Sequence, residues 1–267
     1  MRLLASVRSA KEVEAAVSGG ADIIDAKEPS RGSLGAISPE VFAQIQARVP
    51  LNLEMSAALG DVANSLGVRT SIAALPVVSR LARVYLKLGF SGVTSRRRLR
   101  TLLEVACAVA REATNGAARI IAVAYADNRQ AGSADPEIVW DAAAAAGAAG
   151  VLIDTFSKER GQLFDWIQAE RLQNLVAQAR QAGLLTALAG GLGREQISAV
   201  FRVDPDVVGF RGALCPAGRE GEVSRVRVSQ LKILVIHASG SLKRAPSDRL
   251  STGRETPEPA ANLCRPN

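Results

Sequence analysis

Two side chains at the end of a short apolar stretch have the residue types and the spacing that amine chemistry requires. Residues 22–26 form a largely apolar run that carries Asp25, and Lys27 follows Asp25 by two positions. Side chains alternate between the two faces of a strand, so Asp25 and Lys27 point the same way. A lysine that points inward is costly unless it is paired or reactive. Two interpretations are open: a structural Asp–Lys pair, or an amine with a lowered pKa that forms a Schiff base.

The chain uses arginine far more often than lysine, and its few lysines recur at similar positions. Lys87 and Lys158 lie at or just beyond the ends of two further predicted strands, and Asp154 ends one of these strands. Arginine stays protonated at neutral pH, whereas lysine can release a proton and form an imine. Carboxylates beside several amines can keep one amine charged while another is neutral. These residues predict acid–base and Schiff-base catalysis; the alternative is that the lysines bind phosphate as plain cations.

The elements that position these residues alternate regularly along the chain. Apolar stretches predict strands at residues 3–7, 22–26, 51–58, 84–88, 119–126, 150–154, 184–189 and 206–210. A helical stretch follows each strand, and the helix before residue 84 is predicted to reach Ala82, with Pro76 as a kink or restart inside it. Repeats of about thirty residues predict an α/β fold, a closed (β/α)₈ (TIM) barrel, with an open doubly wound sheet as the alternative. The barrel domain is predicted at residues 1–236, and the Ser-, Pro- and Arg-rich residues 237–267 are predicted to be a disordered tail.

Two glycine-rich loops follow the seventh and eighth predicted strands. In a barrel the carboxyl ends of all strands share one mouth, and the last two loops commonly bind phosphate through backbone N–H groups. The alternative is that each glycine only permits a tight turn. The predicted phosphate-binding residues are Gly190, Gly191, Gly209, Arg211 and Gly212.

Composition and residue patterning argue against several other functions, including nucleic-acid binding, which stays a less favoured alternative. The formal net charge of +7 is a modest field for anionic metabolites and does not require nucleic acid. The basic run at residues 96–100 has no interleaved aromatic residue for base stacking. Cys107, Cys215 and Cys264 have neither disulfide nor zinc spacing, which fits a reducing cytoplasm, and His237 is the only histidine. No stretch has the roughly 18 uninterrupted apolar residues that span a bilayer.

An ordered set of motifs resembles the (5-formylfuran-3-yl)methyl phosphate synthase family, also called 4-(hydroxymethyl)-2-furancarboxaldehyde-phosphate synthase. The most specific motif is residues 19–36, which carries Lys27 and a glycine-bearing loop. One departure is Asn128-Arg129-Gln130, where the family usually has Ala-Tyr-Arg. The resemblance covers about residues 1–236. Its other motifs are residues 56–61, 85–89, 125–127, 154–158, 163–165, 187–190 and 208–213.

The resemblance implies a (β/α)₈ barrel that makes the phosphorylated furan of methanofuran biosynthesis from two molecules of glyceraldehyde 3-phosphate. It implies a Schiff base at Lys27, a proton-accepting Lys87, and further mouth residues Lys158, Asp25 and Asp154. Aldol-type carbon–carbon bond formation, loss of one phosphate, cyclisation and dehydration would follow. An iminium is an electron sink, so no metal and no organic cofactor are expected.

The same resemblance implies a cytoplasmic enzyme of tetrahydromethanopterin-linked one-carbon metabolism. Its expected partner is a small-molecule triose phosphate, with no nucleic acid and no membrane, and a homo-oligomer is left open. The alternative functions are another Schiff-base aldolase or isomerase of triose phosphates and a non-catalytic barrel that binds a phosphometabolite.

Overall fold

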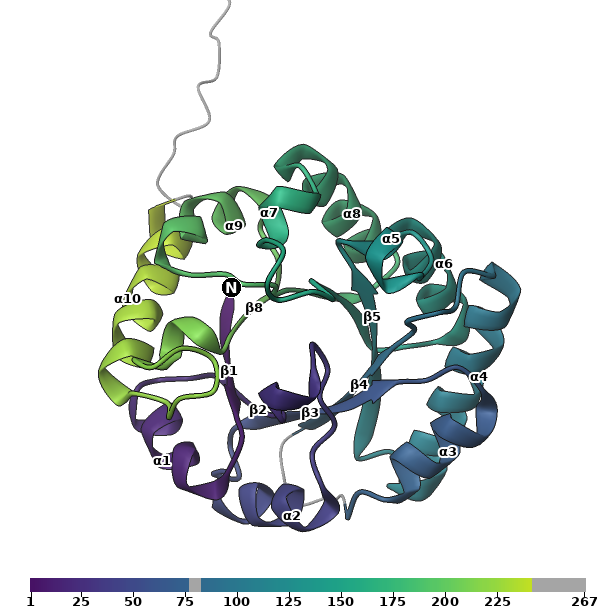
Figure 1. The fold of residues 1–267 in the computed structure, drawn as a ribbon, viewed down its shortest axis with the longest axis horizontal. Coiled ribbons are helices and arrows are strands. Elements are labelled where there is room, and N and C mark those ends of the chain that lie inside the picture. Colours follow the sequence, from purple (N-terminus) through teal and green to yellow (C-terminus); the bar gives the residue numbers. More distant parts are fainter. Residues whose placement is uncertain (77–82, 242–267) are drawn as a thin grey trace, which may run out of the picture.

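The computed structural model describes residues 1–76 and 83–241 and shows eight parallel strands closed into a barrel (Figure 1). Each strand pairs with the next along the chain, and the eighth closes on the first. The predicted (β/α)₈ barrel is therefore confirmed, and the alternative of an open doubly wound sheet is excluded. The strands are β1 (Arg2–Val7), β2 (Ile23–Ala26), β3 (Glu54–Asp61), β4 (Arg83–Gly89), β5 (Ala118–Tyr125), β6 (Gly150–Asp154), β7 (Leu185–Leu188) and β8 (Val207–Phe210).

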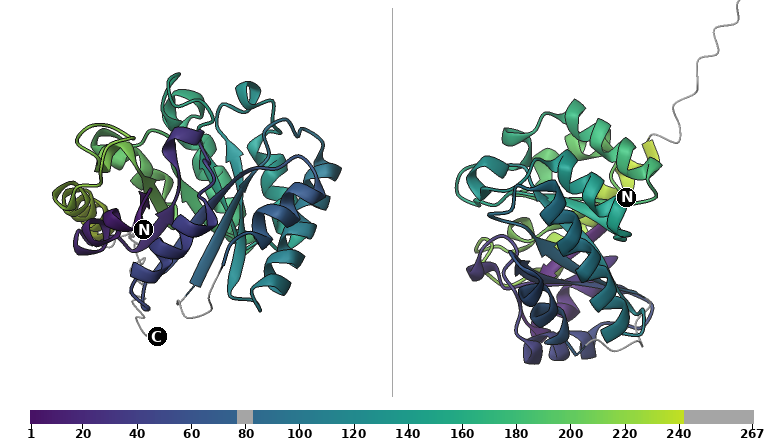
Figure 2. Two further views of the ribbon diagram at one scale, coloured as in Figure 1. Left: turned by 60° about the horizontal axis from the view of Figure 1, so that its bottom comes forward. Right: turned by 90° about the vertical axis from the view of Figure 1, so that its right-hand side faces the viewer.

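The helices form an outer layer around the strands (Figure 2). Several begin where the sequence supplies a cap: the Ser38 side chain accepts the N–H of Val41, and Pro39 occupies the first helical position. The helices are α1 (Ala10–Ser18), α2 (Pro39–Arg48), α3 (Ser65–Ala73), α4 (Arg96–Ala113), α5 (Asn128–Ala131), α6 (Pro136–Ala146), α7 (Leu163–Trp166), α8 (Ala169–Gln181), α9 (Ile197–Val203) and α10 (Arg225–Ser241), with 3₁₀ turns η1 (Pro29–Arg31), η2 (Arg194–Gln196) and η3 (Gly212–Leu214).

The alternation of side chains along each strand divides the buried residues into two layers. On β4, Val84, Leu86 and Leu88 belong to the layer between strands and helices, whereas Tyr85 packs inside the barrel. Each fully buried aliphatic side chain contributes about 1.5–3 kcal/mol relative to an exposed one. By the same alternation Lys87 faces the barrel interior. The core thus explains why polar residues on alternate strand positions converge on one central site.

Most strand ends lie within one position of those that the sequence predicts, and the larger differences are in β3, α3 and α10. β3 begins at Glu54, because Leu51 lies in a turn and is 57% exposed, and it ends at Asp61, three positions beyond the predicted end at residue 58. α3 ends at Ala73, before Pro76, which excludes Pro76 from the helix; residues 77–82 lie outside the described residues. α10 reaches Ser241, five positions beyond the predicted end of the barrel domain. The rest of the predicted tail, 242–267, also lies outside them.

The connection between β2 and α2 folds over the barrel mouth, at the centre of the ring in Figure 1. It is closed at its base, where the N–H of Glu28 donates to the Gly35 carbonyl at 3.0 Å. A side chain at Gly35 would place its Cβ 1.9 Å from the Glu28 oxygen, so only glycine fits there. Across the mouth, Ser33 Oγ donates to the Thr155 carbonyl at 2.6 Å. This connection, residues 27–38, is called the roof loop below.

Candidate active site

All ten residues that the sequence nominates line one cavity of about 610 Å³ at the carboxyl ends of the strands. Asp25 comes from β2, Lys87 from β4 and Asp154 from β6, while Lys27 and Lys158 follow the ends of β2 and β6. All five side chains are largely withdrawn from solvent. Active sites of these barrels lie at this end. The structure therefore brings the lysines and aspartates together as predicted, from three alternate strands.

Asp25 lies at the floor of the cluster and is fully buried. Its carboxylate accepts hydrogen bonds from Ser6 Oγ at 2.7 Å and Ser56 Oγ at 2.6 Å, and Lys87 Nζ lies 2.7 Å away. Burial alone would raise the pKa of Asp25, but the charges of Lys87 and Lys27 and these hydrogen bonds lower it below its ordinary value. Asp25 is therefore an ionised anchor for Lys87.

Asp154 holds the opposite side of the cluster. Its carboxylate accepts the N–H of Thr155 at 2.8 Å, Ser33 Oγ at 3.2 Å and Lys158 Nζ at 2.5 Å. Burial would raise the pKa of Asp154, but Lys158 and Lys27 outweigh it and hold that pKa well below the usual range. Lys158 also donates to the Thr155 carbonyl and hydroxyl, so all three of its N–H donors are used.

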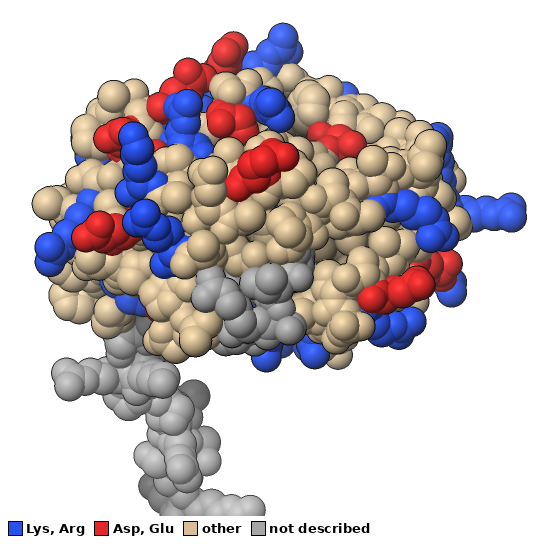
Figure 3. All heavy atoms as spheres, turned by 90° about the horizontal axis from the view of Figure 1, so that it is seen from below, with Lys and Arg blue, Asp and Glu red and all other residues tan. Residues whose placement is uncertain are grey.

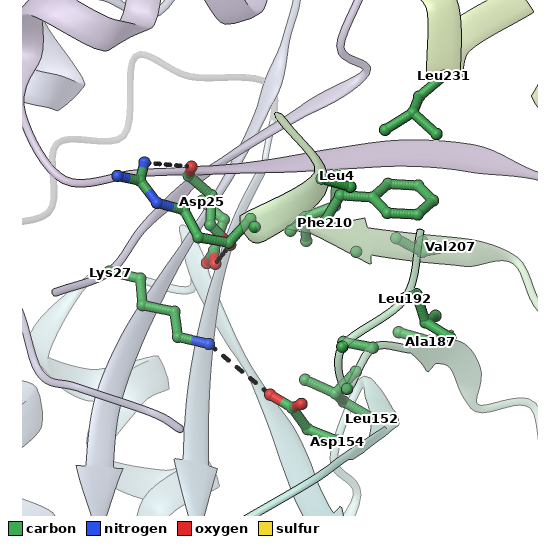
Figure 4. Close-up of a pocket in the computed structure, with 18 of the residues that line it drawn as sticks. Leu4, Asp25, Lys27, Leu152, Asp154, Ala187, Leu192, Val207, Phe210 and Leu231 are labelled. Atoms are coloured by element: carbon green, nitrogen blue, oxygen red, sulfur yellow. Dashed lines mark hydrogen bonds and ion pairs between the residues drawn. The ribbon is translucent and has the colours of Figure 1, made fainter. Parts of the chain in front are cut away.

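Lys27 differs from its two companions because its amine makes no hydrogen bond among the described residues. Its Nζ lies 3.7 Å from Asp154 Oδ2, and the two side chains face each other across the cavity (Figure 4). Burial lowers the pKa of Lys27, Asp154 opposes that effect, and the nearby Lys158 and Lys87 charges lower it further, to about 7. A large fraction of this amine is thus neutral at physiological pH. A neutral amine is the nucleophile that imine formation requires.

The glycine-rich loops form a second wall of the cavity. The N–H groups of Gly190, Gly191, Gly212 and Ala213 donate to no protein acceptor in residues 1–76 and 83–241. Gly190 has φ +109°, and an added Cβ would lie 2.9 Å from Thr155 Cγ2. Unpaired N–H groups in such a concavity favour an anion. These four N–H groups are called the glycine cradle below.

Arg211, which the sequence predicts to bind phosphate, has its guanidinium committed to protein partners in the structure. Arg211 lines the cavity, but its guanidinium forms a buried ion pair with Glu12, at 2.6 and 3.1 Å. Its other N–H groups donate to the carbonyls of Ser6, Arg219 and Gly221. All five donors are occupied, so Arg211 fixes the β8–α10 connection instead of presenting free donors.

Several residues of the site are absent from the sequence-based set. Ser6, Ser56 and Ser33 hold the two aspartates; the first two share the inward register of Asp25, a signal that strand pairing supplies. Arg219 lines the cavity from the β8–α10 connection, where no periodicity indicates its direction. Asp127, by contrast, follows the fifth predicted strand and is a candidate from the sequence; it accepts the N–H groups of Phe156 and Ser157 and so positions the loop that bears Lys158.

The segments that suggested other roles lie away from this cavity. Gln130, in the segment that departs from the family pattern, accepts a hydrogen bond from Arg160 and does not line it. In the basic run, Arg96 pairs with Asp141 and Arg100 with Glu104. Basic and acidic side chains are interspersed on the face drawn in Figure 3. No helix of the described segments is long and apolar enough to cross a membrane.

Sequence comparison decides the family. The profile described as 4-HFC-P synthase matches residues 3–232. The chain belongs to this family. It is 35% identical over 237 residues to a (5-formylfuran-3-yl)methyl phosphate synthase of Methanothermobacter thermautotrophicus, covering 88% of this chain and 99% of that protein. It is 37% identical over 217 residues to the Methanopyrus kandleri synthase of the same name, covering 81% and 90%.

Solved structures with low sequence identity share the fold. KGPDC from Streptococcus mutans matches with a TM-score of 0.58 at 14% identity, over 89% of this chain and 98% of that one. Phosphoribosyl anthranilate isomerase from Thermus thermophilus matches with a TM-score of 0.56 at 14% identity, over 91% and 100%. At this identity the likeness establishes the barrel alone.

Proposed function

We propose that the protein condenses two molecules of glyceraldehyde 3-phosphate into (5-formylfuran-3-yl)methyl phosphate for methanofuran biosynthesis, through a Schiff base on Lys27. The observation that carries this proposal is the state of Lys27: a buried amine in a barrel mouth, with its pKa at about 7 and with no hydrogen bond to the described residues. Family membership supports the reaction, and the geometry around Lys27 supports its choice as the nucleophile.

The first step needs only groups that line the cavity. Neutral Lys27 Nζ attacks the aldehyde carbon, and the carbonyl oxygen leaves as water to give an iminium. The iminium withdraws electrons from the adjacent carbon, whose proton then passes to a base. Lys87 matches the family's proton-accepting lysine, and the ionised Asp25, 2.7 Å from its Nζ, holds the amine in position. The resulting enamine attacks the second aldehyde.

The later steps release one phosphate and two waters, which balances the atoms of two triose phosphates against the furan. Lys158 and Asp154 are positioned opposite Lys27 to supply and remove protons during these eliminations. The cavity wall beyond them is apolar, with Leu4, Leu152 and Val207 facing it (Figure 4). An apolar wall suits a flat aromatic product and excludes water.

The proposal is tested by incubating the protein with glyceraldehyde 3-phosphate and following furan absorbance and product mass. The wild type should form the furan phosphate and release one inorganic phosphate per product. Lys27→Arg, which keeps the charge but cannot form an imine at neutral pH, should lose at least ~10³-fold in kcat/KM, whereas Lys11→Arg on the exposed face of α1 should not. A different aldol adduct or an isomerised triose phosphate as the product would instead assign the site to an aldolase or isomerase.

A further inference from the structure

The cluster of lysines and aspartates carries too little positive charge for the two substrates it is proposed to bind. Lys27, Lys87 and Lys158 face Asp25 and Asp154. Their net charge is at most +1, and it falls to zero when Lys27 is neutral and able to react. Two phosphate monoesters bring about −3 to −4 at neutral pH. Further donors must therefore lie at the mouth.

The glycine cradle accounts for one phosphate. Its N–H groups come from the loops after β7 and β8 and are uncommitted within the described part of the chain. Backbone N–H groups suit one phosphate group, with the partial charge of a short turn behind them. The second phosphate needs a separate group, which the ion pairs of the cavity help to identify.

Among the arginines that line the cavity, Arg219 is best placed to bind an anion, because most of its N–H donors have no partner among the described residues. Arg211 is neutralised by Glu12, whereas no carboxylate of the described residues lies within 4 Å of Arg194, Arg219 or Arg227. Arg194 is exposed, and Arg227 donates to the Cys215 carbonyl at 3.3 Å. Arg219 is half-buried, and among the described residues its guanidinium makes a single hydrogen bond, from Nη2 to the Gly32 carbonyl of the roof loop at 3.1 Å.

The place of Arg219 connects it with the reacting groups. Its carbonyl accepts a hydrogen bond from Arg211 Nε at 2.7 Å, so the Arg211–Glu12 ion pair holds its backbone. Its guanidinium reaches the roof loop at Gly32, next to Ser33, which donates to Asp154. Burial lowers the pKa of Lys158, and Asp154 raises it. The charge of Arg219 lowers the pKa of Lys158 further, because the Arg219 guanidinium lies near the Lys158 amine. Arg219 thus lies on the Asp154 and Lys158 side of Lys27.

We propose that Arg219 binds the phosphate of the second triose phosphate, while the glycine cradle binds the phosphate of the triose joined to Lys27. This inference rests on the proposed function and adds a substrate-binding residue to it. Four N–H donors of Arg219 have no protein partner among the described residues, enough for bidentate contact with a phosphate. Arg211 and Glu12 act as positioning residues for it.

The test compares imine formation with furan formation in Arg219→Gln. Trapping with borohydride and glyceraldehyde 3-phosphate should give the Lys27 adduct at a yield within twofold of wild type, because the first triose does not need Arg219. Furan formation should fall roughly 10- to 100-fold in kcat/KM, the value of a charge-assisted contact. Arg219→Lys should recover part of this loss. Arg160→Gln, which removes an exposed arginine outside the cavity, is the matched control and should behave as wild type.

Three outcomes would overturn the inference. Furan formation by Arg219→Gln within twofold of wild type would show that the residue binds no substrate. A parallel loss of imine and furan would place Arg219 on the first triose, provided that its thermal unfolding matches wild type. A wild-type protein that forms neither adduct nor furan would refute the proposed function itself. This result comes from the wild type alone, so it is distinguishable from a failure of the Arg219 proposal.

Discussion

Lys158→Gln should move the pH dependence of imine formation at Lys27 to higher pH. Lys27 has a pKa of about 7 because burial disfavours its charge and the Lys158 and Lys87 cations add repulsion to that effect, against the attraction of Asp154. Replacing Lys158 removes one repulsive charge. It also leaves Asp154, which binds Lys158 Nζ at 2.5 Å, to attract Lys27 alone. Both changes stabilise protonated Lys27, so the sign of the shift is the same for each.

The size of the shift follows from the distances. Lys158 Nζ and Lys27 Nζ lie 2.5 and 3.7 Å from the two oxygens of the same carboxylate. They are therefore within roughly 8 Å of each other, where two unit charges repel by about 2 kcal/mol at an effective dielectric constant of 20. Since about 1.4 kcal/mol corresponds to a tenfold change in the protonation equilibrium, the midpoint should rise by roughly 1.5 pH units.

The assay is borohydride trapping of glyceraldehyde 3-phosphate over pH 6 to 10, with the adduct measured by intact mass. Wild type should reach half of its maximal initial rate near pH 7, and Lys158→Gln near pH 8.5. The phosphate of the substrate also titrates, but it does so equally in both proteins and cancels in the comparison. Lys11→Gln removes an exposed lysine of α1 and should keep the wild-type midpoint. A midpoint that stays in place or falls in Lys158→Gln would refute the reasoning.

Three further outcomes follow from the structure. Glu12→Gln should lower the free energy of unfolding in urea by about 3–5 kcal/mol, because it leaves the buried charge of Arg211 unpaired. The same substitution at the partly exposed Glu137 should cost at most about 1 kcal/mol, and equal losses would contradict this. Gly190→Ala should raise KM by about tenfold or more through the clash of its Cβ with the β6–α7 loop, whereas Gly147→Ala, with an open surrounding, should leave KM unchanged. Chelation by EDTA should not change kcat, since no cluster of three metal-ligating side chains occurs among the described residues; an activity lost to EDTA and restored by a metal would refute that.

The placement of the lysines and aspartates was predictable from local patterns. Period-2 alternation assigns Asp25 and Lys87 to the inner faces of their strands, and barrel topology brings those strand ends together. The scarcity of lysine in an arginine-rich chain made Lys27 conspicuous. These signals need only neighbouring residues and the order of the strands, which is why they were sufficient.

Hydrogen bonds and ion pairs between segments far apart in the sequence determine the residue roles that local patterns could not predict. Arg211 lies on a loop that suits phosphate binding, but its partner Glu12 is 199 positions away and takes its donors. Arg219 sits in an irregular connection, so its direction depends on the hydrogen bond from Arg211 and on Gly32. Leu51 has strand-like neighbours and yet lies in an exposed turn, because burial depends on where the barrel begins. Long-range geometry, and not local propensity, determined each of these roles.

The most direct test of the central claim is to identify the residue that carries the reduced adduct. Wild-type protein is incubated with glyceraldehyde 3-phosphate at pH 7, treated with borohydride, digested and mapped by tandem mass spectrometry. The amine of Lys27 has a pKa of about 7 and makes no hydrogen bond within residues 1–76 and 83–241, which predicts a single triose-phosphate adduct, on Lys27. An adduct on Lys87 or Lys158 instead, or no adduct while the furan phosphate still forms, would contradict the account.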